Sequence, residues 1–245
     1  MSGMDLTPYH EWAKEALGFD FDNIDLLATA LTHRSYVNEH KKSTKHHNER
    51  LEFLGDAVLE LAVTRFLYEN YSEPEGTLTA WRSALVRTES IRDAGVALGY
   101  EHLIRTSRGE KKASESAKKH IVANAFEALI GAIYLEKGYD VAEKFIAKNI
   151  LSKMGEIIES GSWRDPKSHL QELSQRYDLS VPLYKVLAED GPDHDKNYTV
   201  GAFVGSRKIG VGTGTSKQAA EQTAAREGIK AYADRRKTKA KKPAK

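Results

Sequence analysis

Residues 48–61, with the sequence NERLEFLGDAVLEL, determine how the front of this chain folds. At about 100° per residue along a helix, Glu49, Glu52 and Asp56 fall within about 60° of one another. Apolar residues such as Leu54 and Val58 fall on the opposite side. The pattern predicts one amphipathic helix with three carboxylates on a single stripe, and like charges at this spacing repel one another.

A solvated acidic surface is the simplest interpretation of such a stripe, but a second helix argues against it. Residues 116–135 have the sequence SAKKHIVANAFEALIGAIYL, in which Glu127 is the only acidic residue. Asn124 precedes it by three positions, so both side chains share one helix face. A carboxylate in so apolar a helix is costly when it is buried without a partner, and it needs a cation or a hydrogen-bond donor.

Packing of these two helices against each other would gather five oxygen-bearing side chains: Glu49, Glu52, Asp56, Asn124 and Glu127. Such a cluster suits Mg²⁺, with Mn²⁺ as the alternative ion, because Mg²⁺ combines one or two carboxylates with water and phosphate oxygens. A bound divalent ion can activate water and stabilise the leaving oxygen in phosphodiester hydrolysis. The chain has no cysteine, which excludes thiolate metal sites and cysteine nucleophiles. The spacing therefore predicts a nuclease.

Apolar residues at helical spacing fill the first 160 residues, and no segment before Trp163 alternates as a strand does. We expect helices over 5–17, 22–32, 48–71, 77–98, 118–137 and 139–158. The residues Glu159-Ser160-Gly161-Ser162 predict a linker. Asp165-Pro166 then begins a helix that should run to about residue 177, followed by three antiparallel strands and a last helix over 217–233.

The expected fold class is thus an all-α domain over 1–160 followed by a small α+β (α-β-β-β-α) domain over 164–234. A basic tail over 235–245 is expected to be disordered. It holds seven Lys and Arg residues and no acid, and without it the net charge of +2 becomes −5. The tail either keeps the chain soluble or contacts phosphates without sequence preference, and both interpretations stay open.

The motif NERLEFLGDAVL resembles the defining motif of the bacterial ribonuclease III family. The likeness extends to LTHRS (31–35), EGTLTAWRSALV (75–86) and ANAFEALIGAIYLE (123–136), and it continues through a double-stranded-RNA-binding domain. The resemblance implies that Glu52, Asp56 and Glu127 are metal-binding and catalytic acids. It also implies that Glu49 belongs to the same acidic valley and that Glu75 acts in cleavage.

The same resemblance implies a cytoplasmic homodimer that processes ribosomal, messenger and other structured RNA. Each subunit would cut one strand of double-stranded RNA and leave short 3′ overhangs with 5′-phosphate and 3′-hydroxyl ends. No apolar run approaches the roughly 18 residues of a membrane span, and no secretory leader is visible at the N-terminus. Gly210, Gly212 and Gly214 lack the strand–helix–strand context of a dinucleotide site, so we expect no nucleotide cofactor and tight packing there instead.

One position departs from the family pattern. The residue three before the second-helix Glu is usually Asp, in a motif such as ADAFEALIG, and here it is Asn124. An amide oxygen can bind Mg²⁺ but brings no charge. Asn124 is therefore a tolerated natural variant, a cause of impaired activity or a substrate-trapping change. We favour a working enzyme, with a non-cleaving double-stranded-RNA-binding protein as the alternative.

Proteins recognise double-stranded RNA by its shape, across two minor grooves and the phosphates between them. The second domain offers side chains for all three contacts. They are Ser168, Gln171, Glu172 and Gln175 on its first helix, His194 in the loop GPDHD, and Ser216 and Lys217 at the start of its last helix. The family usually has a second Lys after Lys217, and Gln218 in its place predicts weaker phosphate binding. A zinc site at His40, His46 and His47 is a minor alternative, since their spacing matches no usual ligand pattern.

Overall fold

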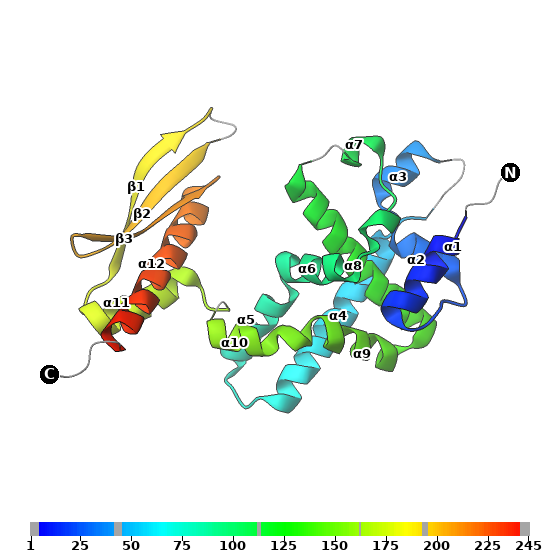
Figure 1. The fold of residues 1–245 in the computed structure, drawn as a ribbon, viewed down its shortest axis with the longest axis horizontal. Coiled ribbons are helices and arrows are strands. Elements are labelled where there is room, and N and C mark those ends of the chain that lie inside the picture. The colour runs from blue at the N-terminus through cyan, green and yellow to red at the C-terminus, as the bar shows by residue number, and fades with distance from the viewer. Residues whose placement is uncertain (1–4, 42–45, 112–113, 162, 193–195, 241–245) are drawn as a thin grey trace. The chain divides into compact units, whose positions relative to one another are not determined.

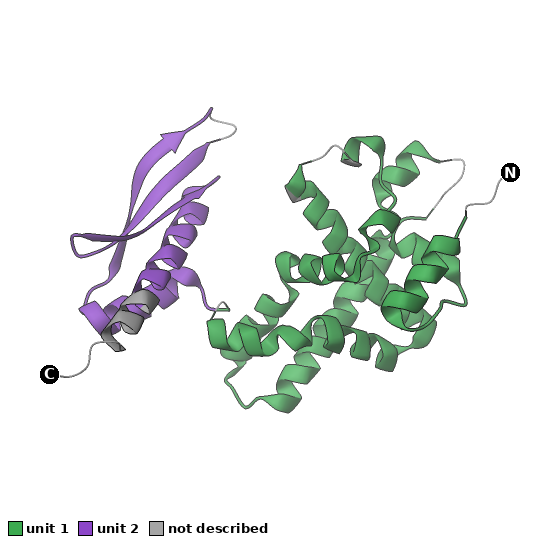
Figure 2. Ribbon diagram, viewed as in Figure 1, with its two compact units in different colours: residues 1–163 green, residues 164–245 purple. Residues whose placement is uncertain are grey.

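The computed structural model describes residues 5–41, 46–111, 114–161, 163–192 and 196–240. The chain divides into two compact units, Met1–Trp163 and Arg164–Lys245 (Figure 2). The division falls directly after the composition break at residues 159–162. Among the described residues, no helix is both long enough and apolar enough to cross a membrane.

The first unit is helical, as the sequence predicts, and its described residues form no strand beyond an isolated bridge between Thr32 and Arg105. Figure 1 shows its elements, which in chain order are α1 (Thr7–Trp12), the π-helical turn η1 (Ala13–Leu17), α2 (Ile24–Ala30), α3 (Arg34–Glu39), α4 (Glu49–Asn70), α5 (Glu75–Val86), α6 (Thr88–Leu98), the 3₁₀ turn η2 (Tyr100–Leu103), α7 (Arg108–Lys111), α8 (Glu115–Lys137), α9 (Tyr139–Asn149), the 3₁₀ turn η3 (Leu151–Lys153) and α10 (Met154–Ser160).

The core of this unit forms around α4 and α8, which cross in its interior and contact each other more extensively than any other pair of elements (Figure 1). Leu59 and Val63 of α4 and Phe126 and Leu129 of α8 are fully buried. Helices α2, α6, α7 and α9 lie against α8, and α5 and α9 lie against α4. The apolar face predicted for α8 lies in this core, whereas the face predicted for α4 does so only in part, because Leu54 on that face is half-buried.

Two expected helices are each divided in the structure. The expected helix over 77–98 is split into α5 and α6 at Arg87, whose backbone is extended with a ψ of 149°. The expected helix over 139–158 is interrupted after Asn149 by η3. No glycine or proline marks either break. The cause is packing, because α5 lies against α4 and α10 whereas α6 lies against α8. The short helix α3 was not predicted.

The second unit has the predicted order α-β-β-β-α, with α11 (Pro166–Asp178), β1 (Pro182–Asp190), β2 (Asn197–Val204), β3 (Arg207–Gly214) and α12 (Lys217–Ala240). The strands form an antiparallel sheet in the order β1-β2-β3. Leu170 of α11, Val200 and Ala202 of β2 and Ala224 of α12 meet in its core. The fold class is thus confirmed for both units.

Two details of the second unit differ from expectation. A β-bulge between Val186 and Ala188 interrupts the alternation expected along β1. The last helix continues to Ala240 rather than ending at residue 233, so the beginning of the basic tail is helical rather than disordered. Residues 234–240, with the sequence DRRKTKA, contain neither glycine nor proline, which is consistent with the extension. Residues 241–245 lie outside the described residues.

The three glycines of β3 have the packing role that the sequence predicts. A Cβ atom on Gly210 would lie 2.2 Å from the carbonyl oxygen of Ala224, and one on Gly212 would lie 2.2 Å from the amide nitrogen of Ala224. A Cβ atom on Gly214 would meet the amide nitrogen of Ala220 at 2.7 Å. These glycines therefore let β3 pack directly on the backbone of α12.

Candidate active site

Two glycines determine how closely the acidic helices approach each other. A Cβ atom on Gly55 of α4 would lie 1.7 Å from the backbone oxygen of Glu127 in α8. On the other helix, a Cβ atom on Gly131 would lie 2.3 Å from the backbone oxygen of Leu51. The backbones of α4 and α8 are therefore in direct contact. Because Asp56 follows Gly55, this contact carries the carboxylates of α4 to the side of Glu127.

The crossing brings Glu52, Asp56, Asn124 and Glu127 together. Burial, reinforced by the negative charges of Asp56 and Glu52, raises the pKa of Glu127 to about 7. The pKa of Glu52 is also raised, first by burial and then by Glu49 and Asp56, while a hydrogen bond with the Asn124 side chain opposes the rise. Glu52, Asn124 and Glu127 are half-buried and Asp56 is exposed, so the cluster opens to solvent.

The chemistry of this cluster fits a hard divalent cation. It offers three carboxylates and one amide, which are oxygen ligands of the kind that Mg²⁺ and Mn²⁺ accept. Burial and the charges of neighbouring carboxylates both raise the pKa values of Glu52 and Glu127, and a bound cation would relieve that repulsion. Among the described residues, no three His, Asp or Glu side chains already form a metal-binding group. The side chains would therefore have to turn toward an ion to bind it.

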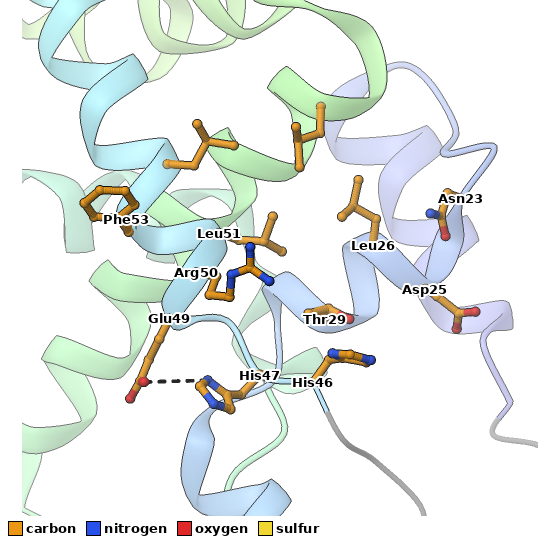
Figure 3. A pocket seen from close by; sticks show the side chains of 12 residues that line it. Asn23, Asp25, Leu26, Thr29, His46, His47, Glu49, Arg50, Leu51 and Phe53 are labelled. Atoms are coloured by element: carbon orange, nitrogen blue, oxygen red, sulfur yellow. Dashed lines mark ion pairs between the residues drawn. The ribbon is translucent and has the colours of Figure 1, made fainter.

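Glu49 differs from the other acids because each of its oxygens faces a basic side chain. Its Oε1 lies 3.2 Å from Nη1 of Arg34, and its Oε2 lies 3.8 Å from Nδ1 of His47 (Figure 3). The helical stripe could not reveal these partners, because Arg34 begins α3 and His47 lies in the segment before α4. The motif LTHRS at 31–35 was the available signal for Arg34.

A hollow of about 760 Å³ opens beside Glu49 (Figure 3). His46, His47 and Arg50 line it together with apolar residues that include Leu54 and Leu135. Glu52, Asp56 and Glu127 are not among its lining residues, so the hollow is separate from the acidic cluster. The ring of His40 stacks on Tyr36 with the centroids 4.1 Å apart. The described residues therefore give no support to a zinc site formed by these histidines.

Glu75 lies apart from the other predicted acids within one chain. It is the first residue of α5, it is exposed, and it accepts a hydrogen bond from Oγ1 of Thr79 at 3.4 Å. Helix α4 rises about 1.5 Å per residue, so its residues from Asp56 to Asn70 span on the order of 20 Å. Because α5 begins beyond that far end of α4, one chain alone does not bring Glu75 to the cluster.

The first helix of the second unit presents its predicted RNA-binding residues to solvent. Gln171, Glu172 and Gln175 are exposed along α11. The amide and hydroxyl groups of Ser168 both donate to Oδ1 of Asp165, at 2.9 and 3.0 Å, which confirms Asp165 as the N-cap. Glu172 also forms an ion pair of 3.6 Å with Arg164.

The start of α12 holds the other predicted contacts. Ser216 caps this helix, since its Oγ accepts a hydrogen bond from the amide of Ala219 at 3.1 Å. The Nζ atom of Lys217 lies 3.1 Å from Oε1 of Glu189 and 5.4 Å from the centre of the Tyr198 ring. His194 lies outside the described residues. The basic group best placed to bind phosphate is thus already paired with an acid of the same unit.

Comparisons with known proteins agree with both units. Residues 23–154 match the family model described as Ribonuclease-III-like, and residues 166–232 match the double-stranded RNA binding motif. A protein named Ribonuclease 3 from Listeria innocua is 40% identical over 219 residues, which cover 88% of this chain and 94% of that protein. A Ribonuclease 3 from Streptococcus gordonii is 41% identical over 216 residues, covering 86% of this chain and 91% of that protein.

A solved structure supports the fold of the first unit. The nuclease domain of ribonuclease III from Campylobacter jejuni is 38% identical to this chain, with a TM-score of 0.51, and the match covers 58% of this chain and 98% of that domain. A helical nuclease unit with an acidic cluster, followed by a double-stranded-RNA-binding unit, defines an endoribonuclease that acts on double-stranded RNA. The chain belongs to the ribonuclease III family, which confirms the resemblance found in the sequence.

Proposed function

We propose that this endoribonuclease hydrolyses double-stranded RNA with Mg²⁺ bound at the acidic cluster. The observation that supports the proposal is the crossing of α4 and α8, which brings Glu52 and Asp56 close enough to Glu127 that their negative charges help to raise its pKa. In this proposal the three carboxylates and the Asn124 amide oxygen hold the ion. Mn²⁺ would substitute for Mg²⁺, because both accept oxygen ligands.

A divalent ion bound there supplies an activated water and neutralises charge on the leaving oxygen. The oxygen of water forms a bond to phosphorus, the bond from phosphorus to the 3′ oxygen breaks, and that oxygen takes a proton. The products are 5′-phosphate and 3′-hydroxyl ends. With a pKa of about 7, Glu127 is about half protonated at neutral pH in the free protein and would lose that proton when a cation binds beside it.

The second unit positions the duplex in this proposal. The exposed polar groups of α11 suit 2′-hydroxyls in a minor groove, and Lys217 with the first amides of α12 suits a phosphate. His194, from the loop between β1 and β2, would enter the next minor groove. We place the action of the enzyme in the cytoplasm, on precursors of ribosomal RNA and on other structured RNA.

A homodimer is the proposed working form. Phe53 and Tyr68 of α4 are each 80% exposed and Leu61 is 58% exposed, although all three are large apolar side chains. Their spacing places them on one stripe of the helix, which favours burial against a second copy. The nuclease domain from Campylobacter jejuni has a structurally flexible region that is involved in dimer formation. A role for Glu75 at the cluster would require such a second copy.

The test of the proposed function is cleavage of a plain RNA duplex, end-labelled, beside the same strands unpaired. We expect the duplex to be cut with Mg²⁺ and left intact with EDTA or with Ca²⁺, and the new ends to carry 5′-phosphates. The variant Glu52→Gln should lose cleavage while retaining duplex binding. Cleavage that survives in Glu52→Gln would contradict the proposed role of the cluster and would favour a structural role for the acidic stripe.

The second candidate function is a double-stranded-RNA-binding protein that does not cleave. It is motivated by Asn124, which brings an amide where the family usually has a carboxylate. Duplex binding without cleavage under all metal conditions would favour it.

A further inference from the structure

RNA phosphates must approach a nuclease unit whose acidic cluster repels them. Among the described residues, Arg34 is a basic group that lies at the edge of this cluster. Its Nη1 is 3.2 Å from Oε1 of Glu49, and Glu49 is close enough to Glu52 that its charge raises the pKa of that residue. The side chain of Arg34 is nevertheless 64% exposed. A guanidinium carries five donors, so one contact with Glu49 leaves others for a phosphate.

The backbone around Arg34 is tied to the start of the acidic helix. The amide of Asn48, next to Glu49, donates to the carbonyl of Thr32 at 2.9 Å. His33 caps α3, since its Nδ1 accepts from the amide of Ser35. The amide of His33 in turn donates to the carbonyl of Arg105 at 2.9 Å. Arg34 and Glu49 therefore begin two helices whose first residues are held in a fixed relation.

The partners of Glu49 also bear on its own role. Arg34 and His47 face its two carboxylate oxygens, whereas Glu52, Asp56 and Glu127 repel one another and form no ion pair with another described residue. To bind a metal ion, the Glu49 carboxylate would have to leave both basic groups. To hold the Arg34 guanidinium in place, it needs no movement from the position that it already has.

We propose that Arg34 binds a phosphate of the RNA strand beside the cleavage point. In this arrangement Glu49, assisted by His47, is a positioning residue that orients the guanidinium, and the metal ligands are Glu52, Asp56, Asn124 and Glu127. The inference rests on the proposed function, since it assumes that duplex RNA lies against the acidic cluster. Arginine suits the task because its planar donors match phosphate oxygens.

The experiment uses the full-length chain and a short RNA duplex, with binding measured in Ca²⁺ at several salt concentrations and cleavage measured in Mg²⁺. Arg34→Ala should weaken duplex binding by about tenfold, the size expected for a hydrogen bond to a charged group. It should also reduce the slope of log affinity against log salt by about one phosphate contact. Arg34→Lys should restore part of the affinity, because it keeps the charge but loses the planar donors.

Lys14→Ala is the matched control. Lys14 also forms an exposed ion pair, at 3.1 Å with Asp20, and its side chain is 66% exposed. The control removes one positive charge from the same unit and should leave affinity and salt slope unchanged. Exposed ion pairs contribute little to stability, so Arg34→Ala and Lys14→Ala should both remain folded.

Glu49→Gln separates the positioning role from metal binding. We expect it to weaken duplex binding as Arg34→Ala does, to leave the Mg²⁺ concentration for half-maximal rate unchanged, and to add nothing further in the double variant. Wild-type affinity and salt slope in Arg34→Ala would overturn the proposal. So would a Glu49→Gln variant that needs tenfold more Mg²⁺ but binds RNA normally. A wild type that binds the duplex without cutting it in Mg²⁺ would instead contradict the proposed function, and the binding data would still decide the role of Arg34.

Discussion

Replacing Gly55 with alanine tests whether the contact between α4 and α8 builds the active site. The added Cβ would lie 1.7 Å from the backbone oxygen of Glu127, whereas ordinary contact begins at 3.4 Å, so the helices must separate by roughly 1.7 Å. Overpacking a core costs about 1–3 kcal/mol. Because helix backbone cannot rotate away as a side chain can, we expect the upper end, about 3 kcal/mol. That loss corresponds to a melting temperature lower by roughly 6–12 °C in a protein of this size.

The assay is thermal unfolding followed by circular dichroism, together with duplex cleavage well below the melting temperature. The rate of duplex cleavage by Gly55→Ala should fall at temperatures at which the variant is still folded. The reason is that separation of the helices moves Asp56 away from Glu127. Gly155→Ala is the matched control, since nothing lies within 4 Å of its Cβ position in α10. That control should gain up to about 1 kcal/mol from helix propensity. A Gly55→Ala variant that melts and cleaves like the wild type would show that this contact does not build the site.

Three further predictions concern charge. Burial and the charges of Asp56 and Glu52 raise the pKa of Glu127 to about 7, so the folded protein keeps a proton that the unfolded chain loses at lower pH. In EDTA, this contribution to stability is present below the ordinary glutamate pKa and is lost as pH rises through about 7, while Mg²⁺ binding tightens over the same interval. Melting curves and Mg²⁺ titrations at pH 5 to 8 check both trends. A contribution of Glu127 to stability that grows as the pH rises would contradict them. Glu189→Gln should strengthen duplex binding by up to about fivefold, because an exposed ion pair with Lys217 is worth at most about 1 kcal/mol; unchanged or weaker binding would count against it. Truncation after residue 234 should lower affinity and flatten its salt dependence, whereas an unchanged slope would show that the basic tail makes no phosphate contact.

The sequence located the two helices that matter because each of them keeps its apolar residues at regular spacing. The same periodicity placed Glu52 and Asp56 on one face of α4 and Glu127 on α8. It could not identify the crossing point, because a glycine within a helix does not reveal which backbone will approach it. Gly55 and Gly131 acquire their meaning only when the other helix lies against them.

Tertiary packing also explains the other differences. The breaks at Arg87 and after Asn149 follow from neighbouring helices and not from a helix-breaking residue. The partners of Glu49 come from α3 and from the segment before α4, so a count of charges along one helix missed them. Glu75 carries the right chemistry for the cluster but begins α5 at the far end of α4, a separation that spacing along the sequence does not show.

The decisive experiment compares the rate of duplex cleavage by the wild type with that of Asn124→Asp over one Mg²⁺ titration. We expect the wild type to cleave, and we expect Asn124→Asp to change the rate or the Mg²⁺ requirement only modestly, since an added carboxylate strengthens a site that already binds the ion. A wild type that does not cleave at any Mg²⁺ concentration, together with full cleavage by Asn124→Asp, would contradict the proposal that these four side chains form a working metal site.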